Sequence, residues 1–590
     1  MPDRSSNETS KPAKYQQKLH LVLDSLRHQL AHLDALPQLT LLGLIAGIAS
    51  AGIIVAFRLA IDGPLQWAFG SHAEDFESLP RAWAFLLPFL GAVLIGVMLH
   101  YIPKHRRQVS VGHVLDRLHN HQGKLPAYNW AVQFVGGILA LLTGQSMGRE
   151  GPAVHLGAGA SSQLGQWLRL PNNCLRTLIG CGVASAIAAS FNTPMAGVIF
   201  SMEVILMEYT IAGFIPVMMA SVTGAVIGQM IFGSDAAFSS VSTQMNSLWE
   251  LPIIGFAGLI IAVFAATIIR LQLVFNEQQR YPIIARLGFA GAVTGLLAIW
   301  YPQILGVGYD TIASSMQGQL SLHLLLGILF AKILATTLSG GLGMPGGVIG
   351  PMLFVGAVLG GVIGIVADTL LPATGVNPGF YVLLGMGAMM AAVINAPLAA
   401  LITVFELTQN PNTIFPTMLI IVIAVIATRQ LFRCEGLFIA QLEANGFNLN
   451  NGPIRQALDR VGVRSVMESQ FLRCPHQLTA HQLQQRLQQH PKWLLIDDQD
   501  EDKYLLSAAD VSAFLDSIEA DSDLTLKLRT IPGRQWLLKP IHQQASLFEA
   551  QVLLRQHKAD ALYVERSASP WLSPVVGVIT QDHIDNYYRV

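Results

Sequence analysis

The stretch Gly148-Arg149-Glu150-Gly151-Pro152 interrupts an apolar region of the chain and places a carboxylate at the start of a short helix of small residues. Further along, Gly346-Gly347-Val348-Ile349-Gly350-Pro351 has the same surroundings: an apolar helix and a Gly-rich turn before it, and a small-residue helix after it. Interruptions at membrane depth are tolerated only where the freed backbone is buried in protein or lines a polar route. The two stretches therefore predict an all-α membrane fold with broken helices.

A second pair of motifs follows in the same order. Asn192-Thr193-Pro194-Met195-Ala196, with Glu203 after it, recurs as Asn395-Ala396-Pro397-Leu398-Ala399, with Glu406 after it, and each matched position is 203 residues apart. Because both pairs of similar motifs occur in the same order in the two halves of the chain, we predict two structural repeats. For Glu203 and Glu406 we expect a structural role, as caps or as bridges at a dimer or cytoplasmic face.

Paired, interrupted helices in the two halves of a transporter point to a binding site near the middle of the bilayer. The first N–H groups of each helix lack partners, and the helix dipole adds about half a positive charge there. Several such ends that meet at one place form an anion site without a formal cation. Small residues also allow close helix packing, which is an alternative for the glycines, but packing does not explain the paired prolines.

The composition places most of the chain in lipid. Of its 590 residues, 52% are hydrophobic and 12% are charged, and the mean hydropathy of +0.47 lies outside the range of soluble globular proteins. The net charge of −1 lacks the basic excess of a nucleic-acid-binding protein. The four cysteines have no metal-ligand spacing, so we expect them to be packing residues and expect no metal site.

Apolar segments cover the first three quarters of the chain. A membrane helix needs about 20 mostly apolar residues. The continuous candidates are 38–60, 83–102, 129–144, 213–232, 250–272, 283–300, 322–339, 379–394 and 412–428. The shorter candidates, broken by Gly, Pro, Asn or Glu, are 148–168, 176–191, 194–208, 343–369 and 397–408.

Three regions follow from the composition. The polar N-terminus has no cleavable signal, so we expect it to stay in the cytoplasm, with an amphipathic helix over 15–36 that is either interfacial or solvated. Near residue 450 the charge density becomes normal and β/α-like patterning begins, which predicts a soluble domain. The predicted boundaries are 1–37 for the N-terminal segment, 38–447 for the membrane domain with repeats at about 38–232 and 250–430, and 454–525 and 526–590 for two soluble halves.

GREGP at 148–152, GGVIGP at 346–351 and the two NxP…E motifs resemble the CLC family of chloride channels and transporters, over roughly residues 40–447. The polar tail, with Ser507–Asp510 and Gly577–Asp582, resembles a pair of CBS domains. The resemblance implies the CLC fold of two inverted repeats with a cytoplasmic α/β CBS pair. It also implies a homodimer with one pathway per subunit for chloride or a similar monovalent anion, in the cell membrane (the inner membrane of a bacterium), with several membrane passes and both termini cytoplasmic.

Glu150 is the first candidate for a functional residue. A carboxylate at membrane depth is costly unless it has a role or a partner. In the CLC family this glutamate is the gate, which fills an anion site when ionised and leaves it when protonated or displaced; a salt bridge to Arg149 is the alternative. The resemblance assigns the pathway to the backbone amides and turns of Gly148, Arg149, Gly151, Pro152, Val348, Ile349 and Gly350.

Two positions depart from the family pattern at the central anion site. The family usually has a GSGIP-like segment whose serine hydroxyl donates to the anion, and the matching segment here is 107–113, in which Ser110 is the candidate substitute. The family's tyrosine near the last membrane helix is Phe438 here. Without these hydroxyls the site would depend on backbone amides.

A third departure concerns the mechanism. Proton-coupled members carry an inner glutamate directly after the position of Glu203, and this chain has Val204. This favours a channel-like pathway, which needs weak, multiple sites. The alternative is an anion/proton antiporter whose protons reach Glu150 through water or through another group such as Glu208, because some antiporters of the family also lack the inner acid.

A histidine cluster lies beside several Lys and Arg residues in the segment 100–121. Imidazole titrates near neutrality, so the cluster could sense cytoplasmic pH, with His113 nearest the expected anion entrance. The Lys and Arg residues have a simpler explanation in the excess of positive charge on cytoplasmic loops. The cluster consists of His100, His105, His113, His119 and His121.

The CBS-like halves raise the question of a nucleotide. In CBS pairs that bind adenine nucleotides, a Ser or Thr and an Asp three residues later hold the ribose. Ser507 and Asp510 have this spacing, whereas Thr580 is followed by Asp582 after two residues. An adenine nucleotide is therefore the one cofactor we consider, and a dimer-stabilising domain without a ligand is the alternative.

Other classes of function have weaker support. A nucleotide-sensing membrane regulator would carry intact transport motifs without measurable flux. We expect no enzyme, because the sequence shows no intramembrane ligand cluster or activated nucleophile. It also lacks GxxxxGK[ST], so ATP-driven pumping has no phosphate cradle.

Overall fold

The structure is a computed structural model that describes residues 35–70, 75–234, 238, 245–370, 372, 376–446, 458, 461–497, 503–517, 525–557, 559–565 and 575–587. The predicted amphipathic helix over 15–36 lies almost wholly outside these residues. The chain divides into two compact units. One consists of Leu39–Gln166 and Leu175–Leu449, and the other of Met1–Gln38, Trp167–Cys174 and Asn450–Val590.

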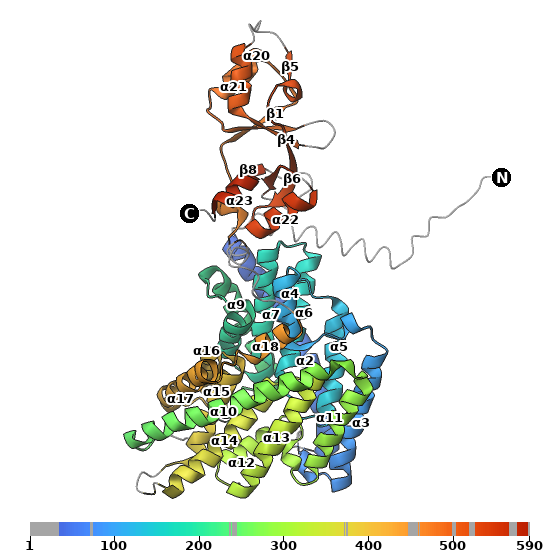
Figure 1. Cartoon of the computed structure of the whole chain (residues 1–590), viewed down its shortest axis with the longest axis vertical. Helices are drawn as coiled ribbons and strands as arrows, with labels where there is room; N and C mark the ends of the chain where they lie inside the picture. Colours follow the sequence, from blue (N-terminus) through green and yellow to red (C-terminus); the bar gives the residue numbers. More distant parts are fainter. Residues whose placement is uncertain are drawn as a thin grey trace, which may run out of the picture. The chain divides into compact units, whose positions relative to one another are not determined.

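The first unit is helical, and its helices are broken where the sequence predicts breaks (Figure 1). Among the described residues, eight helices are long and apolar enough to cross a membrane. The helices are α2 (Ala35–Phe69), α3 (Arg81–His100), α4 (Ser110–Asn120), α5 (Ala127–Leu142), α6 (Glu150–Trp167), α7 (Asn172–Phe191), α8 (Pro194–Phe200), α9 (Ile211–Phe232), α10 (Leu251–Asn276), α11 (Ile283–Ala298), α12 (Tyr309–Met316), α13 (Leu322–Leu342), α14 (Ile349–Leu370), α15 (Pro378–Ile394), α16 (Pro397–Thr408), α17 (Ile414–Ile426) and α18 (Leu437–Ala444).

The NxP motifs explain two of the breaks. Asn192 and Asn395 adopt the left-handed conformation, with φ of 57° and 62°, directly after α7 and α15. Asparagine tolerates this conformation better than most residues do. Two residues later Pro194 and Pro397 open α8 and α16, where the missing proline N–H would have had no partner. Each motif therefore ends one helix and starts the next.

Small residues bring helices into close contact in both halves. A Cβ on Gly157 of α6 would collide with the carbonyl of Gly182 on α7. In the second half, a Cβ on Gly356 of α14 would collide with the carbonyl of Gly385 on α15. Such contacts substitute in lipid for the hydrophobic effect that drives helix packing in water. The two helices that begin at the GREGP and GGVIGP stretches are thus fixed against their neighbours.

The second unit contains an α/β domain with a six-stranded sheet in the order β1-β3-β4-β6-β7-β8. The strands β1 and β3 are parallel and β3 and β4 antiparallel, and the same sequence of pairings recurs in β6, β7 and β8. β4 and β6 join the two halves. The strands are β1 (Phe471–Pro475), β2 (Gln477–Thr479), β3 (Trp493–Asp497), β4 (Lys503–Ser507), β5 (Thr525–Lys527), β6 (Trp536–His542), β7 (Ala561–Glu565) and β8 (Val575–Thr580).

The helices of this domain are α20 (Ala480–Leu487), α21 (Ala508–Ser517), α22 (Leu547–His557) and α23 (Gln581–Tyr587). Each half has a hydrophobic core of its own, around Leu494 in the first half and Leu562 in the second. A helix follows the last strand of each half, α21 after β4 and α23 after β8. The predicted α/β domain with two similar halves is therefore present.

The four cysteines are free and buried, as predicted for packing residues. Among the described residues, no group of three His, Cys, Asp or Glu side chains could hold a metal ion.

Candidate functional site

The two Gly-rich stretches meet in space through a pair of backbone hydrogen bonds. The Gly148 N–H donates to the Gly347 carbonyl at 2.7 Å, and the Gly347 N–H donates to the Gly148 carbonyl at 2.8 Å. Helix α6 begins two residues after Gly148, and helix α14 begins two residues after Gly347. The N-termini of two helices from different halves are therefore held side by side, as the internal repeat predicts.

The Glu150 side chain lies at this junction and is 5% exposed. A Cβ added to Gly350 would lie 2.6 Å and 2.7 Å from its two carboxylate oxygens, so the carboxylate packs against the Gly350 backbone. The Tyr309 hydroxyl donates to Glu150 Oε1 at 3.3 Å. The carboxylate of one half thus closes the space beside the helix start of the other half.

The alternative interpretation of Glu150, an ion pair with Arg149, finds little support in the geometry. Arg149 Nη1 lies 4.0 Å from Asp62 Oδ1, and its guanidinium lies over the rings of Phe191 and Tyr309, 5.2 Å and 5.5 Å from their centroids. The neighbouring Arg58 shares Asp62, at 3.6 Å. Arg149 therefore has Asp62 as an ion-pair partner, and it acts on the neighbouring Glu150 carboxylate by its charge.

The predicted pathway amides do not all have the same environment. The Gly148 N–H is used in the bridge to Gly347, so it is not an open donor. A Cβ on Gly151 would lie 2.6 Å from the Gly347 Cα, and one on Gly148 would collide with Glu150 Oε2. Gly151 thus allows close backbone packing, whereas Gly148 and Gly350 make room for the Glu150 carboxylate.

A cavity of about 710 Å³, which we call the vestibule, reaches this junction. Its lining includes three predicted pathway residues, Ser110, Val348 and Phe438. Met147 also lines it, three residues before Glu150. The structure therefore places Ser110, Val348 and Phe438 on the vestibule wall and Gly148 and Gly350 around the Glu150 carboxylate, whereas Arg149 lies with Asp62.

Ser110 is held in an unusual backbone conformation. Its φ of 73° lies in the left-handed region, and its N–H donates to Gln133 Oε1 at 2.8 Å. Gln133 is fully buried and donates from Nε2 to the Pro345 carbonyl at 3.0 Å. One glutamine of α5 thus joins the start of α4 to the turn before α14, and it fixes Ser110 relative to Val348.

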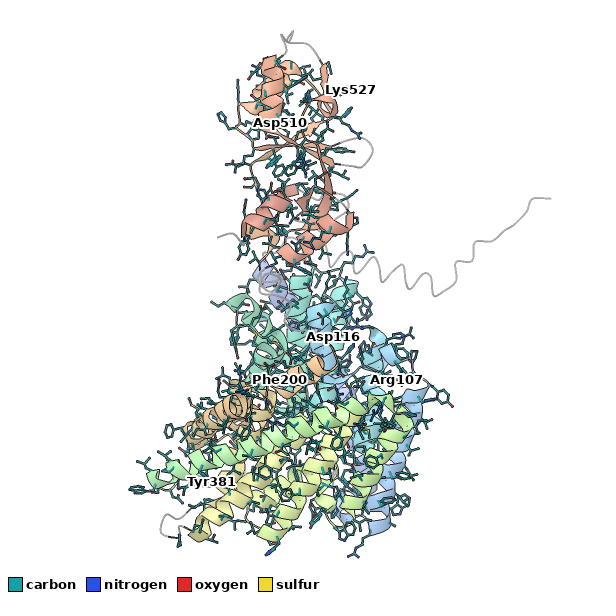
Figure 2. The ribbon with its side chains drawn as sticks, viewed as in Figure 1. Arg107, Asp116, Phe200, Tyr381, Asp510 and Lys527 are labelled. Carbon is teal, nitrogen blue, oxygen red and sulfur yellow. The ribbon has the colours of Figure 1, made fainter. Side chains whose placement is uncertain are left out.

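The charges of the vestibule favour anions. Four side chains with a permanent positive charge line it, and Asp116 is the only described carboxylate that does. Asp116 accepts from Asn120 Nδ2 at 2.9 Å and lies 3.7 Å from His121 Nδ1. Figure 2 labels Arg107 and Asp116, which lie before and within α4. The cations are Lys104, Arg107, Arg280 and Arg286.

The paired acids Glu203 and Glu406 cap helices of the opposite repeat. Glu203 accepts from the N–H groups of Leu398 and Ala399 at 3.2 Å and 2.7 Å. Glu406 accepts from those of Met195 and Ala196 at 2.9 Å and 2.8 Å. The predicted capping role is confirmed. Because each carboxylate caps a helix of the other repeat, the two repeats are also joined to each other, which the sequence pattern did not indicate. Val204, next to Glu203, is buried.

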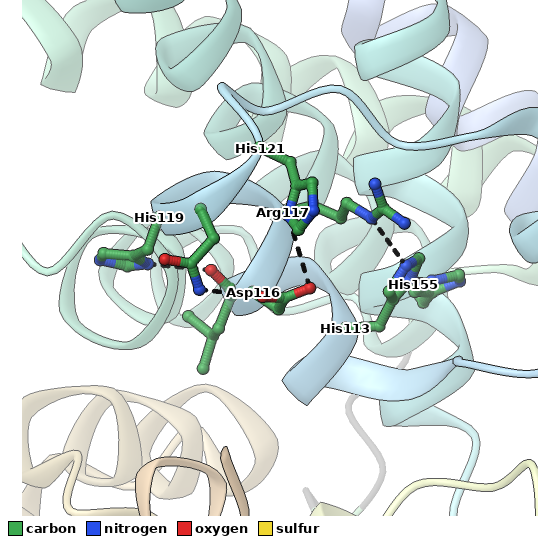
Figure 3. A network of polar contacts seen from close by, with 8 residues as sticks. His113, Asp116, Arg117, His119, His121 and His155 are labelled. Atoms are coloured by element: carbon green, nitrogen blue, oxygen red, sulfur yellow. Dashed lines mark hydrogen bonds and ion pairs between the residues drawn. The ribbon is translucent and has the colours of Figure 1, made fainter. Parts of the chain in front are cut away.

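Two histidines of α4 and α6 meet in the interior (Figure 3). His113 Nδ1 lies 2.8 Å from His155 Nε2, and Arg117 Nε donates to His113 Nε2 at 3.1 Å. Because arginine only donates, His113 Nε2 must be an acceptor, and the one ring proton of His113 points to His155. Arg117 therefore holds His113 neutral, which disfavours the predicted pH-sensing role for this residue.

The remaining histidines of the cluster are dispersed. His100 and His105 line the vestibule. His119 Nδ1 lies 2.9 Å from the Leu115 carbonyl, and His121 faces Asp116. The five residues therefore do not form one titrating group.

The nucleotide candidates occupy equivalent places in the two halves of the α/β domain. Ser507 ends β4 and Asp510 lies in the first turn of α21, while Thr580 ends β8 and Asp582 lies in the first turn of α23. Thr580 Oγ1 accepts from the His583 N–H at 3.4 Å, so this hydroxyl serves as a helix cap.

Sequence reasoning did not identify Tyr309 or the residue that fixes it. Lys332 is fully buried, and its ammonium donates to the carbonyls of Ile304 and Gly306 at 2.9 Å and 2.8 Å. These carbonyls lie in the turn that leads to Tyr309 at the start of α12. A lysine in the middle of the apolar helix α13 was the signal that could have shown a buried polar contact.

Comparisons with known proteins agree with this arrangement. The family model described as voltage gated chloride channel matches residues 91–429. A putative chloride channel protein ClcB-like of Ralstonia nicotianae is 32% identical over 394 residues, which are 65% of this chain and 91% of that protein. An H(+)/Cl(−) exchange transporter ClcA of Vibrio parahaemolyticus is 28% identical over 411 residues, which are 66% of this chain and 85% of that protein.

The fold comparison points the same way. A crystal structure of a slow cyanobacterial Cl−/H+ antiporter matches with a TM-score of 0.61 and 24% identity, over 71% of this chain and 100% of that one. The broken helices, the bridged Gly-rich stretches and the family match together lead to one conclusion. The chain belongs to the voltage-gated chloride channel (CLC) family.

Proposed function

We propose that this protein moves chloride or a similar monovalent anion across the membrane, with Glu150 as the gate of the pathway. The observation that carries the proposal is the position of the Glu150 carboxylate, which is buried against Gly350, one residue further along the chain than Ile349, while Val348 just before it lines the cation-lined vestibule. An anion in the vestibule would meet this carboxylate next.

Electrostatics explains how such a gate works. The N-termini of α6 and α14 attract any negative charge. A carboxylate and a chloride ion repel each other, so they cannot occupy one place together. An anion that arrives from the vestibule, or a proton that neutralises Glu150, therefore displaces the carboxylate from Gly350.

The central anion site would depend on few hydroxyl groups. Ser110 supplies a hydroxyl at the vestibule wall, whereas Phe438 offers none. The N–H groups of Val348, Ile349 and Gly350 at the start of α14 are the other donors we assign to it. Because this site offers few donors, we expect weak binding and modest selectivity among monovalent anions.

Two mechanisms differ in whether protons move with the anion. Val204 at the inner position, buried and without a titrating group, supports channel-like passage. Coupled exchange is the second candidate, because a 28% identical relative is named as an H(+)/Cl(−) exchange transporter. In that case Glu208, which is half-buried, or water would supply the inner proton route.

The vestibule would face the cytoplasm. The segment before α4 carries Lys104, Arg106 and Arg107, and positive residues gather on cytoplasmic loops. With this orientation both termini lie in the cytoplasm, and the protein is a multi-pass protein of the cell membrane. We further propose the homodimer that the CLC resemblance implies.

For the α/β domain we propose a CBS pair that binds an adenine nucleotide through Ser507 and Asp510. The support is their equivalent position to Thr580 and Asp582 after the last strand of each half. Equilibrium dialysis of the full-length protein with ATP or AMP tests this, with Asp510→Asn as the variant. No binding at millimolar nucleotide would leave the domain with a dimer-stabilising role.

The test of the main proposal records chloride efflux and internal pH together in proteoliposomes diluted into low chloride. Wild type should release chloride, and Glu150→Ala should remove any pH dependence of release. Uphill proton movement that Glu150→Ala abolishes would establish exchange, and its loss in Glu208→Gln would identify the inner acid. Efflux without proton movement would establish the channel-like mechanism. Intact protein without flux of chloride, fluoride, nitrate or bicarbonate would contradict the proposal and favour a nucleotide-sensing regulator.

A further inference from the structure

Arg286 on α11 has an unusual environment for a charged residue. It is half-buried on the vestibule wall. Its Nε atom is inaccessible to solvent and has no acceptor among the described residues. An unsatisfied charged donor in a buried place is expensive. Such a group points to a ligand that supplies the missing acceptor.

The charged neighbour that acts on Arg286 has the same sign. Arg107 repels it across the vestibule lining. Arg107 is itself fixed, because its Nε donates to the Ile102 carbonyl at 2.5 Å and its Nη2 to the His100 carbonyl at 3.0 Å. These bonds leave Nη1 available for another acceptor. Two guanidinium groups are thus held near each other with donors to spare.

Close helix packing keeps the two arginines together. A Cβ on Gly96 of α3 would lie 3.0 Å from the Ile284 Cα on α11, so the end of α3 and the start of α11 are in contact. Arg107 is bonded to the carbonyls of His100, the last residue of α3, and of Ile102 just after it, and Arg286 lies two residues after Ile284. No described carboxylate lies within 4.0 Å of either guanidinium. The fold therefore enforces a like-charge pair without a counter-ion.

We propose that Arg286 and Arg107 form a binding site for the transported anion on the vestibule wall, where a small monovalent anion is held before it reaches Ser110. The site rests on the proposed anion transport and adds a loading step to it. A bound anion gives Arg286 Nε its acceptor and reduces the repulsion between the two arginines. Arg280, exposed on the same lining and in contact with the Tyr281 ring at 5.2 Å, lacks this confinement.

The experiment measures the initial rate of chloride transport by the full-length protein in proteoliposomes, against chloride concentration at constant ionic strength. Arg286→Gln should raise the half-saturating concentration about fivefold, as expected for a unit charge about 4 Å from the ion in water. The maximal rate should be retained. Arg286→Lys should restore most of the affinity for chloride, because it keeps the positive charge. Arg280→Gln should change the half-saturating chloride concentration less than twofold, because exposed charges are screened.

Two outcomes would overturn the site while transport itself stands: an unchanged half-saturating concentration in Arg286→Gln, or equal shifts in Arg286→Gln and Arg280→Gln. Equal shifts would mean that the positive charges of the vestibule attract the anion together, without a binding site at Arg286. Absence of flux in wild type would contradict the proposed function, and bromide then tests the site directly. Anomalous diffraction from bromide-soaked crystals of the wild type should show a peak beside Arg286 that Arg286→Gln lacks, and no peak in wild type would also overturn the proposal.

Discussion

Removal of the Tyr309 hydroxyl should loosen the gate. This hydroxyl donates to Glu150 Oε1 at 3.3 Å. The ring is held independently, with its centroid 5.5 Å from the Arg149 guanidinium and 5.8 Å from the Phe238 ring. Tyr309→Phe therefore keeps the ring in place and deletes one bond to the carboxylate. Glu150 should then leave its position against Gly350 more readily.

The size of the effect follows from the bond. A hydrogen bond to a charged group contributes about 1.5–3 kcal/mol when its geometry is good. The distance of 3.3 Å exceeds that of a strong O–H···O⁻ bond, so we take about 1 kcal/mol as the loss. This value changes the ratio of closed to open gate by a factor of about five. Where release of the gate limits transport, chloride efflux should rise by up to that factor.

The assay compares chloride efflux from proteoliposomes for wild type, Tyr309→Phe, Glu150→Ala and the double variant. In the Glu150→Ala background there is no carboxylate for the hydroxyl to hold, so the second substitution should have no effect. An equal acceleration in both backgrounds would refute the reasoning, because the hydroxyl would then act by another route. An unchanged rate in a correctly folded Tyr309→Phe protein would refute it as well.

Three further predictions address stability and pH. Glu406→Gln weakens the two hydrogen bonds that cap α8 and should lower the free energy of unfolding by about 1–3 kcal/mol. Thermal unfolding in detergent measures this loss, with Glu208→Gln as the control. An unfolding midpoint of Glu406→Gln equal to that of wild type would contradict the capping role. Arg117→Met frees His113 Nε2 to accept a proton, although burial of the ring still opposes its charge, so transport should become more acid-sensitive than in wild type toward the acid end of pH 5–8, and a pH profile equal to that of wild type would contradict a role of Arg117 in holding the ring neutral. Lys492, 2.6 Å from Glu468 Oε2, lowers the pKa of that carboxyl. The stability it gives is present above the ordinary pKa and lost as pH falls through the lowered pKa, so hydrogen exchange of β1 and β3 should separate wild type from Lys492→Met at pH 7 and no longer in acid below the lowered pKa.

The helix pattern could be predicted from the sequence because the breaks have local causes. Pro194 and Pro397 start helices whatever surrounds them, and Asn192 and Asn395 accept the left-handed turn before them. Every predicted broken segment contains a helix in the structure, but α14 begins at Ile349, six residues after the predicted start at 343, and the segment predicted as 194–208 continues after α8 as a π-helix over Ser201–Leu206. The internal repeat also predicted that the two Gly-rich stretches belong together.

The side-chain partners could not be predicted, because they depend on long-range packing. Tyr309 reaches Glu150 only after the turn before α12 is fixed by Lys332 of α13. The matched positions of Glu203 and Glu406 showed a shared role, but not that each carboxylate would cap a helix of the other repeat. Periodicity and composition report on one segment at a time, and these contacts join segments far apart in the chain.

The near symmetry of the site gives a reason why a single residue would be enough for the gate that we propose. Gly148 and Gly347 occupy matching positions in the two repeats and bond to each other, so the starts of α6 and α14 are arranged nearly symmetrically. Two residues after these glycines, the first repeat has Glu150 and the second has Ile349. Two carboxylates there would repel each other across the bridge. With a single carboxylate, the positive ends of both helices act on one negative charge, and in the gate that we propose an incoming anion would compete with Glu150 alone.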